Sequence, residues 1–330
     1  MNTPLLVDIA RPAPCLSAGA APVACVDIGG TKISVQLVSD NGTLGQRVEP
    51  TLKQGAPDAL ARQVLRMISA SCLAAQVKPG DLGAVGVASC GPFVLGGGGV
   101  ELASPNICGG LAGSGRGLPN DWITAALEGP LREAFGRERV RVENDGIAAL
   151  QAERRWGALQ GLDHCAYVTW STGIGVGLCV DGRVLRGKNG NAGHTGHMFV
   201  SDNFDALCGC GNIGDVEALA AGNALPRRFP AYADAASVLI AAKAGDTCAE
   251  GIIDDICRVM GRMLYNLVAT LDLQRISLGG SVFWHHREFL LPRLQAHVSG
   301  RLPALTDGCA LVPAGLGERV GDFAALALVA

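Results

Sequence analysis

The chain has 330 residues, of which 48% are hydrophobic, and its formal net charge is −3. This length and composition are typical of a globular protein with two domains of ordinary size, and the slightly acidic balance provides no basic surface that would bind nucleic acid or an anionic membrane. Because the sequence lacks a run of about 18 apolar residues, we expect no membrane-spanning segment.

The N-terminal residues and the cysteines indicate the cellular compartment. Residues 1–22 contain Pro12 and Pro14 and lack the apolar stretch of a secretion signal, so we expect a disordered or loosely attached leader. The 12 cysteines are scattered, and several lie in apolar runs where a thiol acts as a small hydrophobic side chain. We therefore expect a cytoplasmic protein without a disulfide framework.

The first half of the chain predicts an antiparallel meander followed by a helix and a buried strand. The first apolar run ends in two glycines, the second run alternates, and the pair Asn41-Gly42 is a strong hairpin turn. Residues 90–119 are rich in Gly and Pro and predict a long loop with little regular structure, which is usually functional. The predicted elements are strands at residues 23–28, 32–38, 44–48 and 84–88 and a helix at residues 57–77.

The second half of the chain partly repeats this pattern. A strand, a glycine-rich turn, a second strand and an Asx-Gly turn occur at residues 23–42 and again at residues 165–182, which is a weak internal repeat of architecture. A wide apolar stripe from Ile252 to Leu271 predicts a long, deeply packed helix. The predicted elements are strands at residues 140–143, 165–170, 176–180 and 275–278 and helices at residues 147–156, 252–271 and 319–329.

Three glycine-rich turns follow predicted strands. Glycine lets a phosphate approach the backbone closely, and neighbouring Thr and Lys side chains add hydrogen-bond donors. Each turn alone would be an ordinary glycine turn, but the first two would hold a polyphosphate if they faced each other. The third could take a flat base against bare backbone. The three segments are Asp27 to Lys32, Ser171 to Gly175, and Gly279-Gly280.

Asn144 and Asp145 lie where a predicted strand gives way to a helix. An acidic residue at this position most often caps the helix. The alternative is a general base at the carboxyl end of a strand, where the ligand sites of α/β proteins lie.

A dense group of potential metal ligands lies between residues 191 and 217. Imidazole and thiolate are the usual ligands of zinc, but there are more candidates than the four that a closed zinc site uses, so some of them must hold something else. The alternative is a polar loop without a metal. The group comprises His194, His197, Cys208, Cys210, Asp215 and Glu217.

Together these motifs resemble, in order and in spacing, the ROK family of sugar kinases, repressors and related proteins, from about residue 24 to the C-terminus. The resemblance implies an α/β, actin-like and hexokinase-like fold of the ribonuclease H type, with ATP and sugar in a cleft between two lobes. It implies a small lobe of residues 23–141 plus about 316–330, and a large lobe of residues 142–315 with a zinc-type loop.

The resemblance also implies roles for individual residues. Asp145 would be the base that accepts a proton from the 6-hydroxyl group of a sugar while Mg2+-ATP donates its γ-phosphate. The sugar would contact Asn106, Asn144, His194, His197 and Glu217. ATP would contact Asp27, Gly29, Gly30, Thr31, Lys32, Thr172, Gly173, Gly279 and Gly280. A structural Zn2+ would be bound by His197, Cys208, Cys210 and Asp215.

Two positions depart from the pattern of the family. His194 stands where Glu is usual, which resembles bacterial N-acetylmannosamine kinases, and a donor at this position would suit an acyl carbonyl. We therefore expect N-acetylmannosamine as substrate, with glucose or another hexose as the alternative. Asp215 replaces the third Cys of the zinc loop; aspartate is a harder ligand, so zinc could be bound normally, weakly or not at all.

Two other functions fit the sequence less well. A sugar-responsive repressor would need a DNA-binding helix-turn-helix ahead of Asp27, where only a short segment with little basic charge is present. A catalytically inactive sugar-binding protein would not need Asp145 and both phosphate turns. We expect a homodimer with a small-molecule sugar as its substrate.

Overall fold

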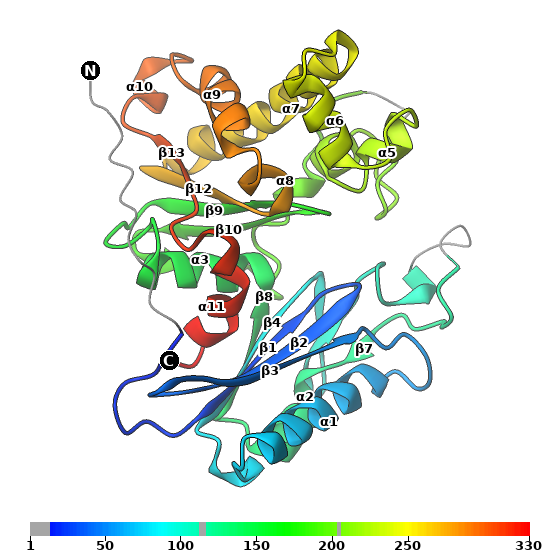
Figure 1. The fold of residues 1–330 in the computed structure, drawn as a ribbon, viewed down its shortest axis with the longest axis vertical. Helices are drawn as coiled ribbons and strands as arrows, with labels where there is room; N and C mark the ends of the chain where they lie inside the picture. Colours follow the sequence, from blue (N-terminus) through cyan, green and yellow to red (C-terminus); the bar gives the residue numbers. More distant parts are fainter. Residues whose placement is uncertain (1–13, 112–116, 203–205) are drawn as a thin grey trace.

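The computed structural model describes residues 14–111, 117–202 and 206–330. Two five-stranded sheets form the centres of the lower and upper halves of the molecule (Figure 1). Across the lower sheet the strands are β3 (Gly42–Pro50), β2 (Lys32–Ser39), β1 (Val23–Ile28), β4 (Ala84–Ser89) and β8 (Val140–Asn144). Across the upper sheet they are β11 (Arg183–Val184), β10 (Ile174–Val180), β9 (Cys165–Trp170), β12 (Arg275–Gly279) and β13 (Ala310–Pro313).

The two sheets have the same topology, which confirms the internal repeat of architecture. In the lower sheet β1 pairs antiparallel with β2 and parallel with β4, and in the upper sheet β9 pairs antiparallel with β10 and parallel with β12. In the lower sheet Ile28 pairs with Ser89, and Ser89 pairs with Asn144. The carboxyl ends of β1, β4 and β8 therefore lie level, which places Asp145 close to the first glycine turn.

Helices cover both sheets and fill the space between them. α1 (Ala59–Ala74) and α2 (Glu128–Phe135) pack on the lower sheet (Figure 1). α3 (Asp145–Trp156) and α11 (Val320–Ala327) lie between the sheets, where α3 contacts β9 and β10 and α11 contacts β1 and β4. Among the described helices, none is long and apolar enough to cross a membrane. The other longer helices are α6 (Ala235–Lys243), α7 (Thr247–Leu271) and α9 (Arg287–Val298). The single-turn helices are α4 (Val216–Ala220), α5 (Leu225–Arg228), α8 (Ser281–Trp284) and α10 (Pro303–Thr306).

The apolar stripe predicted after residue 252 forms the buried face of α7, which packs against α4, α6 and α9 in the upper core. The helix begins five residues earlier than its stripe because Asp246 caps it, accepting hydrogen bonds from the backbone N–H groups of Cys248 and Ala249 at 2.9 and 3.0 Å. It ends at Leu271, and the next residue, Asp272, adopts the left-handed conformation with φ of 51°.

The segment predicted as a long loop contains regular structure, so that prediction was wrong in part. β5 (Phe93–Gly96) and β6 (Gly99–Leu102) form a hairpin, and β7 (Ala125–Ala126) extends it into a three-stranded sheet. Strands of four residues give too short an alternation to be distinguished from a loop. Phe93 and Leu102 anchor this small sheet in the lower core.

The N-terminal leader was expected to be loose. Residues 1–13 lie outside the described residues, but residues 14–22 contact the lower sheet. The N–H of Leu16 donates to the carbonyl of Ser39 at 3.0 Å, and the N–H of Gly83 donates to the carbonyl of Pro22 at 2.8 Å. The predicted boundary between the lobes, after residue 141, falls inside β8. The lobe boundaries stay a prediction.

Candidate active site

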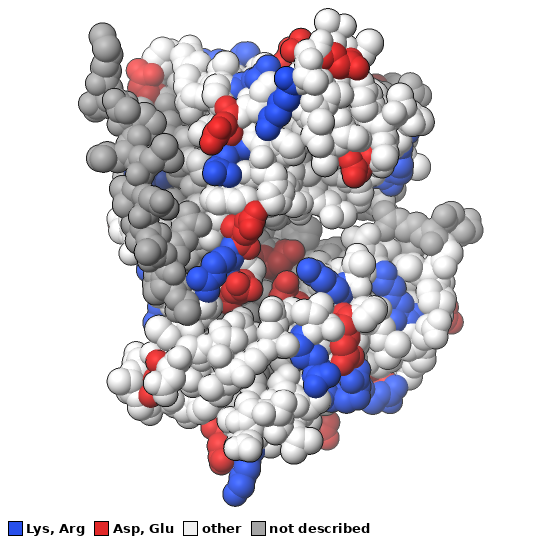
Figure 2. Space-filling view, viewed as in Figure 1, with Lys and Arg blue, Asp and Glu red and all other residues white. Residues whose placement is uncertain are grey.

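A cavity of about 710 Å³ lies between the two sheets, within the usual size range for small-ligand sites. Figure 2 shows the corresponding hollow between the two halves of the molecule, with acidic side chains beside it. The cavity brings together the residues predicted from separate motifs: Asp27, Gly29, Gly30, Thr31, Lys32, Asn106, Asn144, Asp145, Thr172, Gly173, His194, His197, Cys210 and Glu217.

The first glycine turn closes β1 and β2 into a tight hairpin at the cavity. The N–H of Gly29 donates to the carbonyl of Lys32 at 2.9 Å, and the hydroxyl of Thr51 on the next strand connection donates to the carbonyl of Gly29 at 2.7 Å. A Cβ atom at Gly30 would lie 2.9 Å from the Cβ of Asn106. Only glycine therefore fits between the turn and Asn106, and this close approach leaves bare backbone facing the cavity.

The second glycine turn joins β9 to β10 and faces the same cavity. The N–H of Ser171 donates to the carbonyl of Gly173 at 3.0 Å, and a Cβ atom at Gly173 would lie 2.9 Å from Oε2 of Glu217. Next to this turn, Asn223 carries a buried Oδ1 for which the described residues provide no hydrogen-bond partner. Both turns, with this free acceptor, suit a ligand that has phosphate acceptors and amino or hydroxyl donors.

Asn144 and Asp145 combine the two roles that the sequence left open. The Oδ1 atom of Asn144 caps α3 by accepting the N–H of Gly146 at 3.0 Å, which leaves its Nδ2 as a donor. Asp145 Oδ1 accepts the same N–H at 2.8 Å. Burial raises the pKa of Asp145 to about 6, although the hydrogen bonds from Gly146 and Asn144 oppose this shift. A carboxylate with this pKa is suited to general-base chemistry.

Asp27 shares the cavity with Asp145, whose charge disfavours the ionisation of Asp27. Burial raises the pKa of Asp27 to about 7, the charge of Asp145 adds to the rise, and Lys32 opposes it. A divalent cation bound between these two half-buried carboxylates would favour their ionised forms. Mg2+ prefers oxygen ligands of this kind.

His194 presents a hydrogen-bond acceptor to the cavity, which corrects the expected donor. Its Nδ1 lies 3.0 Å from the backbone carbonyl of Asn191. A carbonyl only accepts, so Nδ1 carries the proton. Burial lowers the pKa of His194 below its usual value, so the ring is neutral at pH 7 and Nε2 has a free lone pair. A Cβ atom at Gly91 would lie 2.8 Å from this Nε2 and 3.2 Å from Nδ2 of Asn144.

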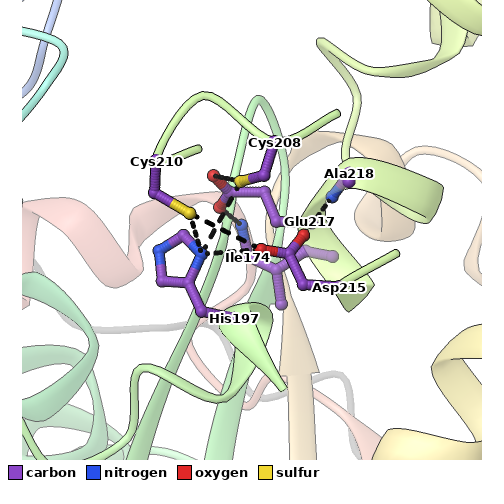
Figure 3. Close-up of polar contacts among 7 residues, drawn as sticks. All are labelled: Ile174, His197, Cys208, Cys210, Asp215, Glu217 and Ala218. Atoms are coloured by element: carbon purple, nitrogen blue, oxygen red, sulfur yellow. Dashed lines mark hydrogen bonds and ion pairs between the residues drawn. The ribbon is translucent and has the colours of Figure 1, made fainter. Parts of the chain in front are cut away.

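His197, Cys208, Cys210 and Asp215 converge on one another (Figure 3), at a side of the cavity that His197 and Cys210 line. The Nδ1 of His197 lies 3.2 Å from Oδ2 of Asp215, 3.5 Å from Sγ of Cys210 and 3.7 Å from Sγ of Cys208. Ligands about 2.0–2.3 Å from a tetrahedral zinc are roughly 3.3–3.8 Å apart, so the four side chains fit a zinc ion. Asp215 also caps α4, because its Oδ1 accepts the N–H of Ala218 at 2.7 Å. The start of α4 therefore holds this member of the cluster in place.

Glu217 connects this cluster to the second glycine turn (Figure 3). Its Oε2 accepts the N–H of Ile174, the first residue of β10, at 3.0 Å, and its Oε1 lies 3.9 Å from the thiol of Cys208. His197 and Glu217 therefore have one side on the ligand cluster and the other on the cavity.

The cavity also differs from the prediction in two respects. Among the described residues, Gly279 and Gly280 are not part of its lining, and their contact with a nucleoside stays a prediction. Added Cβ atoms there would meet Tyr167 Oη at 2.5 Å and the carbonyl of Trp170 at 2.4 Å, so both glycines are needed for packing. Lining residues that no motif indicated include Lys53, Gly91, Ser104, Asn223 and Arg227. Gly91 and Ser104 lie in the segment of residues 90–119 that was predicted as a functional loop, whereas Lys53, Asn223 and Arg227 come from loops and a short helix without sequence signals.

A family model described as the ROK family matches residues 23–330. The chain belongs to the ROK family. Among curated ROK relatives, it is 29% identical to the glucokinase of Aeropyrum pernix over 93% of this chain and 96% of that protein. It is 34% identical to the N-acetylmannosamine kinase of Salmonella typhimurium over 78% of this chain and 82% of that protein.

Solved ROK structures have the same fold. The ROK hexokinase from Thermus thermophilus is 32% identical, with a TM-score of 0.70 over 94% of this chain and 97% of that chain. A ROK glucokinase from Streptomyces griseus, in complex with glucose and AMPPNP, is 25% identical, with a TM-score of 0.64 over 93% of this chain and 99% of that chain. The predicted α/β, hexokinase-like fold with two lobes is thereby confirmed.

Proposed function

We propose that the protein is an ATP-dependent kinase that phosphorylates the 6-hydroxyl group of a hexose or an N-acylhexosamine. The observation that carries the proposal is the position of Asp145, a carboxylate with a raised pKa. Its cavity is also lined by the two glycine turns and by three polar side chains suited to a sugar, those of Asn144, His194 and Glu217. Relatives over most of the chain are named glucokinase and N-acetylmannosamine kinase, which supports a sugar as the acceptor.

Each group of residues has a distinct task in this proposal. The turns at Gly29-Gly30 and Thr172-Gly173 bind the phosphates of ATP, and a Mg2+ ion held beside Asp27 would neutralise their charge. Asp145 accepts the proton of the sugar hydroxyl as the hydroxyl oxygen bonds to the γ-phosphorus, while the bond from the γ-phosphorus to the β,γ-bridging oxygen breaks and ADP leaves. Phosphoryl transfer depends on positioning and charge compensation more than on covalent catalysis, so holding the hydroxyl against Asp145 is the main contribution of the protein.

The sugar is held by groups of complementary character. Asn144 offers an N–H donor, while His194 and Glu217 offer acceptors. Contact with an acyl carbonyl was expected because His194 was taken as a hydrogen-bond donor. Nε2 of His194 is an acceptor, so this argument no longer supports an N-acyl sugar. An acceptor suits the amide N–H of an N-acylhexosamine or a sugar hydroxyl. We keep N-acetylmannosamine as the first candidate on the His194 substitution and the kinases of that name among the relatives.

Glucose is the second candidate. An acceptor at residue 194 would do for a glucose hydroxyl what the usual Glu of the family does. The relative matched over 93% of the chain is named a glucokinase, and the related Thermus thermophilus structure is named a hexokinase. Steady-state assays of ADP release with glucose, mannose, fructose, N-acetylglucosamine and N-acetylmannosamine separate the candidates. The proposal predicts the highest kcat/KM with N-acetylmannosamine, and a higher value with glucose would reverse the order.

We further propose that Zn2+ occupies the cluster of His197, Cys208, Cys210 and Asp215. The ion would fix the loop from which His197 and Glu217 reach the cavity, so its role is structural. His197 would bind it through Nδ1, which leaves the opposite ring nitrogen as an N–H donor toward the sugar.

A further inference from the structure

Asn191 joins two distant parts of the chain across the sugar side of the cavity. Its Oδ1 accepts the N–H of Phe93 at 2.7 Å, and its Nδ2 donates to the carbonyl of the same residue, also at 2.7 Å. Asn191 follows β11 of the upper sheet, whereas Phe93 begins β5, whose sheet is anchored in the lower core. The amide therefore connects the two halves of the molecule at one point.

Asn191 binds backbone groups of Phe93 that no neighbouring strand pairs with. β5 is the edge strand of the sheet β5-β6-β7, so one side of Phe93 presents a free N–H and a free carbonyl. A primary amide matches this pair with one acceptor and one donor. Because the side chain of Phe93 is 2% exposed, the strand end to which Asn191 binds is itself held in the core.

The backbone of Asn191 fixes the sugar-side histidine. The carbonyl of Asn191 receives the Nδ1–H of His194 at 3.0 Å, which leaves Nε2 as the acceptor. This Nε2 faces Gly91, two residues before Phe93. Asn191 therefore fixes two parts of the cavity. Its side chain binds the segment that contains Gly91 and Phe93, and its carbonyl binds His194.

We propose that Asn191 is the positioning residue that sets the sugar specificity of this enzyme. It keeps the lobes and His194 in the arrangement that binds sugar, without contacting the reacting atoms. Without this contact, His194 would hold its Nε2 toward the sugar for only part of the time, so a sugar that depends on Nε2 for its preference loses more affinity than a sugar that does not. The inference rests on the proposed function, because it assumes that His194 contacts a sugar.

The test compares Asn191→Ala and Asn191→Asp with Lys188→Ala, an exposed change in the same loop. The Asp variant keeps the size and the acceptor for the Phe93 N–H but turns a second oxygen toward the Phe93 carbonyl. Loss of hydrogen bonds of this kind corresponds to about a tenfold change in affinity. We expect both variants to raise the sugar KM about tenfold, with kcat at saturating sugar and the KM of ATP within about twofold of the unmodified protein.

A specificity measurement separates positioning from a merely structural role. Both Asn191 variants should bring the kcat/KM values of N-acetylmannosamine and glucose closer together, while Lys188→Ala leaves their ratio unchanged. Calorimetric titration with each sugar measures the same effect on binding without turnover. An unchanged sugar KM and ratio, or an equal loss for ATP and sugar, would overturn the inference. If the unmodified protein phosphorylates no sugar, the proposed function is wrong. In that case sugar binding still tests Asn191, and equal sugar affinity of all variants would overturn its role.

Discussion

One carboxylate oxygen of Asp215 lies 3.2 Å from Nδ1 of His197, while the other accepts the backbone N–H of Ala218 at 2.7 Å. Asp215 is fully buried. Burial raises its pKa, but the hydrogen bonds from His197 and Ala218 outweigh burial and hold the pKa below its usual value. The side chain is thus ionised and caps a helix, and in the proposed zinc site this carboxylate would stand in place of the third Cys.

The first prediction separates these two roles of Asp215. Asp215→Asn keeps the cap and loses the ligand charge, so its zinc affinity should fall by more than about tenfold, whereas Asp215→Cys should retain zinc. Metal analysis and thermal unfolding measure the effect, and a chelator should lower the Tm of the unmodified protein. Asp246→Asn, which changes the cap of α7, is the control. A metal-replete preparation without zinc would contradict the assignment.

The second prediction concerns the pH dependence of turnover. Asp145 must be ionised to act as a base, and its pKa is raised to about 6. We therefore expect kcat/KM to fall about tenfold per pH unit below about pH 6 and to level off above it. Circular dichroism at each pH checks that the fold persists. A profile that is flat between pH 5 and 8 would contradict the role of Asp145.

The third prediction follows from linkage between protonation and folding at Asp27. Its folded pKa of about 7 lies above the ordinary value of 3.8, so the native state favours the protonated form. Its contribution to stability therefore falls as the pH rises from about 4 to about 7. Asp27→Asn should raise the unfolding free energy of the ligand-free protein at pH 7.5, on the order of 1 kcal/mol, and should not do so near pH 4. The exposed change Asp81→Asn is the control in urea unfolding, and equal effects of both changes would count against this explanation.

The fourth prediction tests the space beside His194. A methyl group at Gly91 would lie 2.8 Å from Nε2 of His194 and would displace the ring or the sugar. Gly91→Ala should raise the sugar KM about tenfold or more, with little change in the KM of ATP. Gly97→Ala places its methyl group in open space and should have no effect. Identical kinetics for the two variants would show that His194 does not face the sugar.

The fifth prediction concerns Glu153, a fully buried carboxylate that holds α3 to the upper sheet and the C-terminal segment. Its oxygens accept the N–H groups of Ala158, Gly315 and Leu316 at 2.7–2.8 Å and the hydroxyl of Ser277 at 3.0 Å. Glu153→Ala leaves these donors unsatisfied and should cost about 3 kcal/mol of unfolding free energy. Glu133→Ala, an exposed change on α2, is the control in urea unfolding.

Periodicity and local motifs were enough to predict most strands of the two large sheets, the long helix and both glycine turns, because each depends on neighbours in the sequence, but β11 and β13 were missed. The strand at residues 165–170 was predicted with its observed ends. The β5–β6 hairpin was missed because its strands are too short to show a period. The start of α3 was placed at residue 147, two residues late, because Asn144 caps the helix and brings Asp145 into its first turn.

The candidate site was predictable where ligand types cluster in sequence, as they do at Cys208 and Cys210. It was not predictable where a contact depends on the tertiary fold. The proton position on His194 depends on a carbonyl three residues away, and Asn191 meets Phe93 only because the two halves of the molecule face each other. Arg227 lines the cavity from a single-turn helix that no sequence pattern distinguishes.

The most direct test of the proposed mechanism is the rate of ATP-dependent sugar phosphorylation by Asp145→Asn, measured beside sugar binding by the same variant. The change keeps the size of the side chain and its acceptor for the Gly146 N–H but removes the base. We expect a loss of turnover of at least about 10²-fold, with a sugar Kd within about threefold of that of the unmodified protein. Turnover near that of the unmodified protein would contradict the assignment of Asp145 as the catalytic base.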